Sequence, residues 1–213
     1  PGARPHTDFL TDGSGTASNQ DRRGTYTKVV TGMLNTHLQQ MIDAWAAGQD
    51  NYRKTFEADA DGALEKILTG MIVLSGFETG GERLQPVLDS GDQEDEHSCF
   101  SDNTHRDMVQ DIRGVQNVYL GTYKRLSGSD VSGTGVKAAV AAFDADLAKR
   151  LEDQIAESLR LAEAIVPPFD RAIALDNADG RANLVALVES LRDQEKLLEE
   201  AFRGFGLTVP VVE

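Results

Sequence analysis

The sequence has little cysteine, a shortage of positive charge and no long hydrophobic run. Cys99 is the single cysteine among 213 residues, which excludes an intrachain disulfide framework and a metal site made of cysteines alone. The chain contains 21 Lys and Arg against 35 Asp and Glu, which gives a net charge of −14. This charge argues against binding to nucleic acid and, by charge alone, against binding to an anionic membrane. The longest nearly uncharged apolar run, residues 67–77, is far shorter than the roughly 20 residues of a membrane-spanning helix.

The rest of the composition is typical of a globular protein. Hydrophobic residues make up 40% of the chain and charged residues 26%, which fits neither a disordered nor a membrane protein. The length allows one domain with a sizeable core, or two small ones. Residues 1–23 carry no signal-peptide pattern. Because the chain opens at Pro1 without a methionine, we expect it to be processed or cut from something longer.

Apolar residues recur at steps of three and four, the period of a helix with one buried face. This pattern predicts helices at residues 25–47, 61–77, 104–123, 136–165 and 179–204, with a loop at 89–103 and a Ser/Gly turn at 127–135. Strand signals are nearly absent. We therefore predict an all-α fold, a helical bundle of four main helices plus short additions. Residues 1–24 are expected to form an irregular lead-in, and residues 25–213 a single bundle domain.

Two Asp-Gly pairs could belong either to calcium-binding loops or to the capped N-termini of helices. Around Asp61-Gly62 and Asp179-Gly180 the twelfth position of a calcium loop would be Leu68 or Ala186, where such a loop needs a bidentate glutamate. Both pairs are better interpreted as helix N-termini.

The segment 89–107 differs from the rest of the chain because it concentrates carboxylates and imidazoles. Five acidic residues from Asp89 to Glu96 precede His97, and His105 follows at the start of a predicted helix. Imidazole nitrogen and carboxylate oxygen are the ligands that suit zinc, iron or manganese. We therefore predict a metal site whose candidate ligands are Glu94, Glu96, His97 and His105, oriented by Arg83 and Asp102. The alternative is a solvated acidic loop in which Asp102 or Asn103 caps the helix.

Other chemistry in this segment has weaker support. Cys99 could act as a nucleophile with His97 or His105 as its base, but no third group of a triad is evident. A lone cysteine is more often a small buried hydrophobe. Glu94 and His97 match the Glu-x-x-His pattern of di-iron bundles, but that architecture needs two copies on facing helices.

A longer pattern surrounds these residues. It comprises EDEHSCFSDNTH at 94–105, GVQNVYLG at 114–121, Arg4-Pro5 with Thr7-Asp8-Phe9, DRRGTY at 21–26 and GGERL at 80–84. In these segments the sequence resembles the imelysin-like family, which includes iron-regulated protein A and proteins classed as insulin-cleaving metallopeptidases. Similarity along most of the chain is far more specific than any short motif.

The resemblance implies a two-bundle helical protein that bacteria export, often lipid-anchored in the periplasm or at the outer membrane, with expression tied to iron. It also implies a site between the bundles, to which Arg83, Glu94, Glu96, His97, Ser98, Asp102 and His105 would contribute by position. The family's Gly-x-His-x-x-Glu signature is absent. The chain thus resembles a C-terminal half, so that either a missing N-terminal bundle or a second chain is the expected partner, and the chain is either a truncation, a proteolytic fragment or one of two chains.

Three functions follow as hypotheses. The first is bacterial iron acquisition outside the cytoplasm, by binding iron, zinc or an iron-containing ligand at the acidic and histidine site. The second is a zinc metallopeptidase of the imelysin type, inactive in this fragment because its catalytic motif is incomplete. The third is a structural or partner-binding bundle, whose sign would be an apolar face that the monomer leaves uncovered, since a stable interface takes about 800 Å² per partner.

Overall fold

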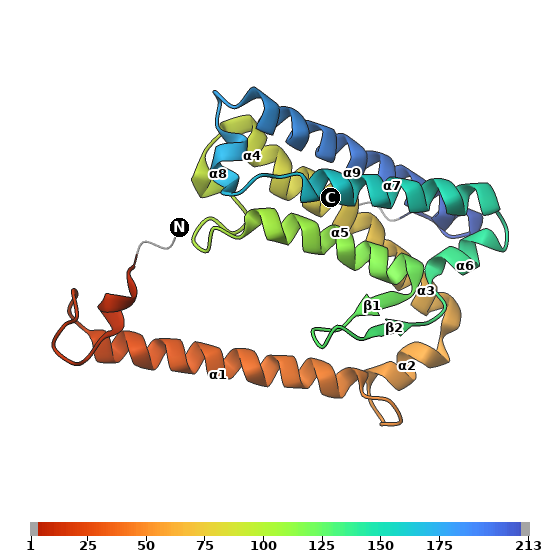
Figure 1. Ribbon diagram of the computed structural model, residues 1–213. Helices are drawn as coiled ribbons and strands as arrows, with labels where there is room; N and C mark the ends of the chain where they lie inside the picture. The colour runs from red at the N-terminus through yellow and green to blue at the C-terminus, as the bar shows by residue number, and fades with distance from the viewer. Residues whose placement is uncertain (1–3, 210–213) are drawn as a thin grey trace. The chain divides into compact units, whose positions relative to one another are not determined.

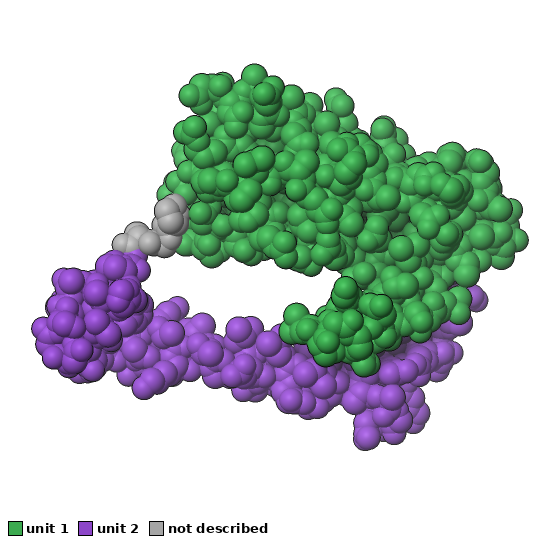
Figure 2. Space-filling model, in the orientation of Figure 1, with its two compact units in different colours: residues 1, 65–213 green, residues 2–64 purple. Residues whose placement is uncertain are grey.

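Helices form most of the chain, as the periodicity predicts. The computed structural model describes residues 4–209, and the all-α class is confirmed (Figure 1). Within those residues the strands are β1 (Thr122–Lys124) and β2 (Asp130–Ser132), an antiparallel pair that matches Tyr123 with Val131. The chain divides into two compact units, unit 2 with residues 2–64 and unit 1 with residues 65–213 (Figure 2). The predicted domain 25–213 extends over both units.

Unit 2 contains the 3₁₀-helix η1 (His6–Phe9), α1 (Gln20–Trp45), α2 (Tyr52–Ala58) and the start of α3 (Ala60–Ile72). Helix α1 begins within the predicted irregular lead-in, which is therefore shorter than 1–24. The reason is tertiary, because the guanidinium of Arg23 donates to the Asp8 carbonyl oxygen at 2.9 and 2.7 Å. Thr16 in turn donates to the buried Asp8 carboxylate at 2.6 Å. The lead-in thus folds back onto the first turns of α1.

Unit 1 is the part of the chain with a hydrophobic core. After α3 it holds the π-helix η2 (Val73–Leu84), α4 (Gln85–Ser90), the 3₁₀-helix η3 (Gln93–Asp95), α5 (Thr104–Leu120), α6 (Val136–Ala141), α7 (Ala145–Glu163), α8 (Phe169–Ile173) and α9 (Ala178–Gly204). The core lies where α4, α5, α7, α8 and α9 meet, and it includes Leu84, Met108, Ile112, Phe169 and Leu191.

The helix predicted at 61–77 is longer and changes its hydrogen bonding. From Val73 to Leu84 it continues as a π-helix, a form that is rare and is often found at functional sites. The Thr79 hydroxyl donates to the carbonyl oxygen of Leu74, five residues earlier, at 2.6 Å. Packing against α9 explains the glycine at position 76, because a Cβ there would lie 1.9 Å from the Oε2 atom of Glu195. Periodicity alone does not distinguish this conformation from an α-helix.

Two other predicted helices end or break earlier than periodicity suggests. Helix α5 ends at Leu120, and Gly121 adopts a left-handed conformation with φ of 69°. The chain then forms the β-hairpin, so that Tyr123, predicted on a helix face, is 54% exposed in β1. The helix predicted at 136–165 is broken between α6 and α7, where the Asp144 side chain caps α7 by accepting from the Leu147 N–H at 2.8 Å.

Both Asp-Gly pairs lie at helix N-termini, as predicted, but the capping side chains are Asp59 and Asn177, two positions before Asp61 and Asp179. The Asp59 carboxylate accepts from the Gly62 N–H at 3.1 Å, and the Asn177 side chain accepts from the Gly180 N–H at 3.0 Å. Each polar side chain thus binds a free N–H at the start of a helix.

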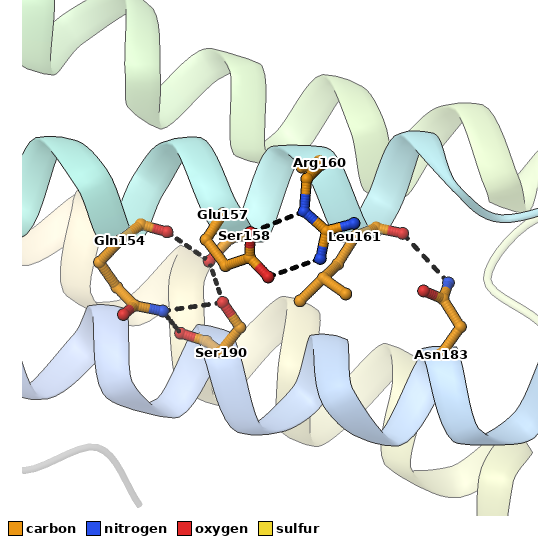
Figure 3. Close-up of polar contacts among 7 residues, drawn as sticks. All are labelled: Gln154, Glu157, Ser158, Arg160, Leu161, Asn183 and Ser190. Atoms are coloured by element: carbon orange, nitrogen blue, oxygen red, sulfur yellow. Dashed lines mark hydrogen bonds and ion pairs between the residues drawn. The ribbon is translucent and has the colours of Figure 1, made fainter.

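Helices α7 and α9 lie side by side and are joined by polar contacts as well as by their apolar faces (Figure 3). The Gln154 amide donates to the Ser190 hydroxyl at 2.8 Å, and that hydroxyl also bonds the Ser158 hydroxyl at 2.8 Å. One turn along, the Asn183 amide donates to the Leu161 carbonyl oxygen at 3.1 Å. Because a buried polar group without a partner is costly, these bonds fix the register of the two helices.

Glu195 should make the stability of unit 1 depend on pH. Burial raises the pKa of Glu195, and the nearby Glu199 charge raises it further. The folded chain therefore holds this proton more tightly than the unfolded chain, and stability is lost as pH rises from the ordinary glutamate pKa through the raised one. We expect Glu195→Gln to gain stability relative to wild type over that interval, measured by urea unfolding at a series of pH values. The exposed Glu189→Gln is the matched control, and an equal gain at every pH would contradict this account.

Candidate functional site

The end of α4, the start of η3 and the Arg181 side chain of α9 hold the acidic segment in place. Helix α4 ends at Ser90, and the next residue, Gly91, turns the chain in a left-handed conformation (φ of 68°). The Asp92 carboxylate then accepts from the Glu94 N–H at 3.0 Å and starts η3. Arg181 of α9 donates to the carbonyl oxygens of Leu88 in α4 and Ile173 in α8, at 2.6 and 2.8 Å. The ends of α4 and α8 are thus tied to the same guanidinium.

Glu96 is the most deeply buried acidic residue of this segment, with 5% of its surface exposed. Its Oε2 atom accepts from the Thr104 hydroxyl at 3.0 Å, while its Oε1 atom is buried without a hydrogen-bond partner. Burial is the main cause that raises the pKa of Glu96, and the negative charges of Asp170 and Asp102 raise it further. The hydrogen bond from Thr104 acts in the opposite direction and lowers the pKa. A buried carboxylate with an unpaired oxygen is costly to maintain.

The groups around Glu96 are also short of hydrogen-bond donors. Asp102 Oδ1 and Asp170 Oδ1 are buried and unpartnered among the described residues, and so is His105 Nδ1 in the first turn of α5. Asp102 adopts a left-handed conformation with φ of 53°, an unusual backbone for a residue other than glycine. Within residues 4–209, no Lys, Arg or His forms an ion pair with Glu96, Asp102 or Asp170. We call Glu96, Asp102 and Asp170 the buried acidic group.

A second set of side chains gathers around Asp111 of α5. Burial raises the pKa of Asp111, while the charges of His97 and Arg83 lower it and that of Asp107 raises it. Arg83 also donates to the Glu78 carboxylate at 2.9 Å within η2. Ser98 connects this set to the buried acidic group, because its N–H donates to Thr104 Oγ1 at 3.1 Å and its hydroxyl donates to the Asp107 carboxylate.

The structure separates the candidate residues by burial. Glu94 and His97 are exposed, while Glu96 is buried and Ser98, Asp102 and His105 are half-buried. Cys99 is half-buried with a free thiol. Asp102 and Asn103 do not cap α5 with their side chains; the Asn103 amide instead donates to Asp107 at 2.8 Å. Neighbouring positions 96 and 97 thus contribute to two different sets of side chains.

Sequence reasoning missed Asp170 and Asp111. Asp170 lies on α8, some 70 positions after the acidic segment. The residues next to it in the sequence, Pro-Pro-Phe-Asp, do not indicate that its charge would act on Glu96, as it does in the structure. Asp111 sits one helical turn after Asp107 on the same helix, a spacing that could have been noticed because residues i and i+4 share a face.

The donor types fit a metal ion only in part. Carboxylate oxygens without donors and an imidazole nitrogen without a partner are suitable ligands for a hard or borderline cation. Within residues 4–209, however, no group of three His, Cys, Asp or Glu side chains is arranged to hold one metal ion. A complete coordination shell would therefore need ligands from outside the described residues. No helix of the described part has both the length and the apolar character needed to cross a bilayer.

Comparisons with known proteins agree with this fold. The family model described as Peptidase_M75, Imelysin, matches residues 1–198. A solved structure of similar fold is the crystal structure of an imelysin peptidase from Bacteroides ovatus, with a TM-score of 0.68 and 18% sequence identity. That similarity covers 85% of this chain and 53% of the Bacteroides chain, so the chain spans about half the length of that protein. No curated protein matches the sequence.

Proposed function

Since the chain belongs to the imelysin family, we propose that it contributes part of a binding site for a metal ion or an iron-containing ligand in bacterial iron acquisition outside the cytoplasm. The observation that supports this most is the buried acidic group. Three carboxylates without an ion-pair partner carry unpaired oxygens there. The Nδ1 atom of His105, in the first turn of α5, is unpaired as well. A cation would satisfy these oxygens and offset the cost of burying Glu96.

This chain would supply only part of the ligands. Since the similarity covers only 53% of the Bacteroides chain, the remaining ligands would come from polypeptide outside this chain, either a missing N-terminal bundle or a second chain. Of the ligands predicted from sequence, Glu96 and His105 offer buried, unpaired atoms. Glu94 and His97 are exposed and would bind from the surface, His97 from the set of side chains around Asp111. Arg83 and Ser98 would orient them. Asp102, predicted from sequence as an orienting residue, would also offer its own unpaired oxygen to the cation.

Isothermal titration tests the proposal. Ferrous, ferric and zinc ions would be titrated separately into this chain and into the full-length protein. We expect binding heat for at least one of the ions, and at least a tenfold loss of affinity in His105→Ala, because removing a ligand or its partner typically costs 10- to 100-fold. His37→Ala, an exposed histidine of α1, is the matched control. Heats that stay unchanged in both His97→Ala and His105→Ala would contradict the proposal.

The name of the Bacteroides protein suggests a second candidate, a zinc peptidase in which the metal activates water and a carboxylate acts as base. We expect no cleavage by this chain alone, because it lacks the Gly-x-His-x-x-Glu signature. Incubation of the full-length protein with an unfolded peptide, with and without chelator, separates the two functions. Cleavage that the chelator abolishes would favour the peptidase over a purely binding role.

A further inference from the structure

The hydroxyl of Thr104, the first residue of α5, connects two parts of the acidic segment. Its oxygen accepts from the Ser98 N–H at 3.1 Å, and the hydroxyl itself donates to the Oε2 atom of Glu96 at 3.0 Å. Thr104 is fully buried. A hydroxyl has one proton to donate, and the Ser98 N–H approaches the oxygen as a donor, so that proton is directed at Glu96. The Oε2 atom of Glu96 therefore has a fixed partner.

Asp107, in the first turn of α5, holds the turn segment 98–103 in place from both ends. One of its carboxylate oxygens accepts from the Ser98 hydroxyl, and the other accepts from the Asn103 amide at 2.8 Å. Within the segment, the Ser101 N–H donates to the Ser98 carbonyl oxygen at 3.1 Å. The Asp107 carboxylate thus ties the start and the end of this segment to α5, and it keeps the Ser98 N–H beside the Thr104 hydroxyl.

This chain of hydrogen bonds decides which oxygen of Glu96 remains available. The Oε2 atom is bonded by Thr104, whereas the Oε1 atom is buried with no partner among the described residues. A simpler role for Asp107 would be to stabilise α5, because a negative charge in the first turn of a helix is favoured by the helix dipole. That role does not require both carboxylate oxygens to bond the segment 98–103, as they do here.

We propose that Thr104 and Asp107 are positioning residues of the candidate site, and that Glu96 binds its cation through the Oε1 atom. Asp107 acts through Ser98 on Thr104, and Thr104 acts on Glu96, so neither of the two touches the cation. Residues that orient a metal ligand from behind typically change metal affinity by about 10- to 100-fold when they are replaced. This inference rests on the proposed function and adds two residues to its site.

Amide hydrogen exchange, followed by NMR in the metal-free full-length protein, tests the hydrogen bonds themselves. Thr104→Val keeps the shape of the side chain but removes the acceptor of the Ser98 N–H. We therefore expect that amide to exchange at least about fivefold faster, in line with the loss of one hydrogen bond. Asp107→Ala should have the same effect because it releases Ser98, whereas Thr104→Ser keeps the hydroxyl and should exchange like the wild type. Core amides of α9 should keep their rates in every variant, which shows that unit 1 remains folded.

Titration of the same full-length variants with ferrous, ferric and zinc ions tests the positioning role. We expect Thr104→Val and Asp107→Ala each to lower the affinity about 10- to 100-fold, and Thr104→Ser to keep it. The double variant Thr104→Val, Asp107→Ala should lose no more than Thr104→Val alone, because residues that act through one network are not additive. Asp179→Ala is the matched control for the charge of Asp107, since it removes an exposed acidic residue from the first turn of α9, and it should leave the affinity unchanged.

Different results would overturn this inference alone or the proposed function with it. If the wild type binds an ion and Thr104→Val binds it equally tightly, the hydroxyl does not position Glu96, and the proposed function stands without it. Additive losses in the double variant would show that Asp107 does not act through Thr104. An unchanged exchange rate of the Ser98 amide in Thr104→Val would show that its hydrogen bond is not formed. A wild-type protein that binds none of the three ions would contradict both the inference and the proposed function.

Discussion

Replacing Phe169 by alanine is expected to lower the free energy of unfolding of unit 1 by about 3–5 kcal/mol, the usual cost of removing a buried phenylalanine. Phe169 is fully buried and is part of the core cluster formed by α4, α5, α7, α8 and α9. Helix α8 has five residues, too few to be stable without tertiary contacts. The ring therefore holds α8 against unit 1, and with it Asp170, the next residue.

Urea unfolding followed by circular dichroism measures this loss. Phe100→Ala is the matched control, because the Phe100 side chain is 71% exposed in the acidic segment, and exposed substitutions usually change stability by less than about 0.5 kcal/mol. Similar losses in the two variants would show that α8 is not held by Phe169.

Replacing Glu96 by glutamine is expected to separate stability from binding. Burial raises the pKa of Glu96, so its charge costs the folded chain stability at pH values above the ordinary glutamate pKa. Glutamine has nearly the same shape and can still accept the hydrogen bond from Thr104. In the absence of metal the variant should therefore be at least as stable as the wild type at neutral pH. Its affinity for the metal ion identified by titration should fall by about 10- to 100-fold.

Glu94→Gln is the control for this substitution, because Glu94 lies in the same segment but is exposed. We expect a smaller loss of affinity from Glu94→Gln, measured by the same titration, and no gain of stability. An equal loss in the two variants would mean that the exposed carboxylates contribute as much to binding as the buried one. A Glu96→Gln variant that is less stable without metal would show that the Glu96 charge stabilises the fold.

The sequence predicted the fold class because helical periodicity is a local property of the chain. Helices α5 and α9 lie within two or three residues of their predicted bounds at most ends. The π-helix η2 was missed because apolar periodicity does not distinguish it from an α-helix. In the structure η2 packs against α9, where the Gln194 amide donates to the Ser75 hydroxyl at 2.7 Å. The hairpin at 122–132 was missed because its side chains are exposed and give no alternating apolar pattern.

The candidate site was predicted in part, for a similar reason. The segment 94–105 stands out by composition, but composition cannot say which of two adjacent residues points inward. Glu96 is buried and His97 is exposed, and that difference depends on the Thr104 hydroxyl and on α8. Asp170 could not be predicted, because its proximity to Glu96 results from the tertiary position of α8. The apolar pattern at 25–47 predicted a helix with one buried face, yet no residue of α1 is buried.

Anomalous X-ray diffraction at the iron and zinc absorption edges tests the central claim most directly. Crystals of the full-length protein would be grown with the metal ion that gives binding heat. The account predicts an anomalous peak within about 2.0–2.6 Å of the Glu96 carboxylate, the range of metal–oxygen bonds, with Asp102, Asp170 or His105 among the neighbouring ligands. A bound metal whose peak lies elsewhere, with the Glu96 carboxylate still unpaired, would contradict it.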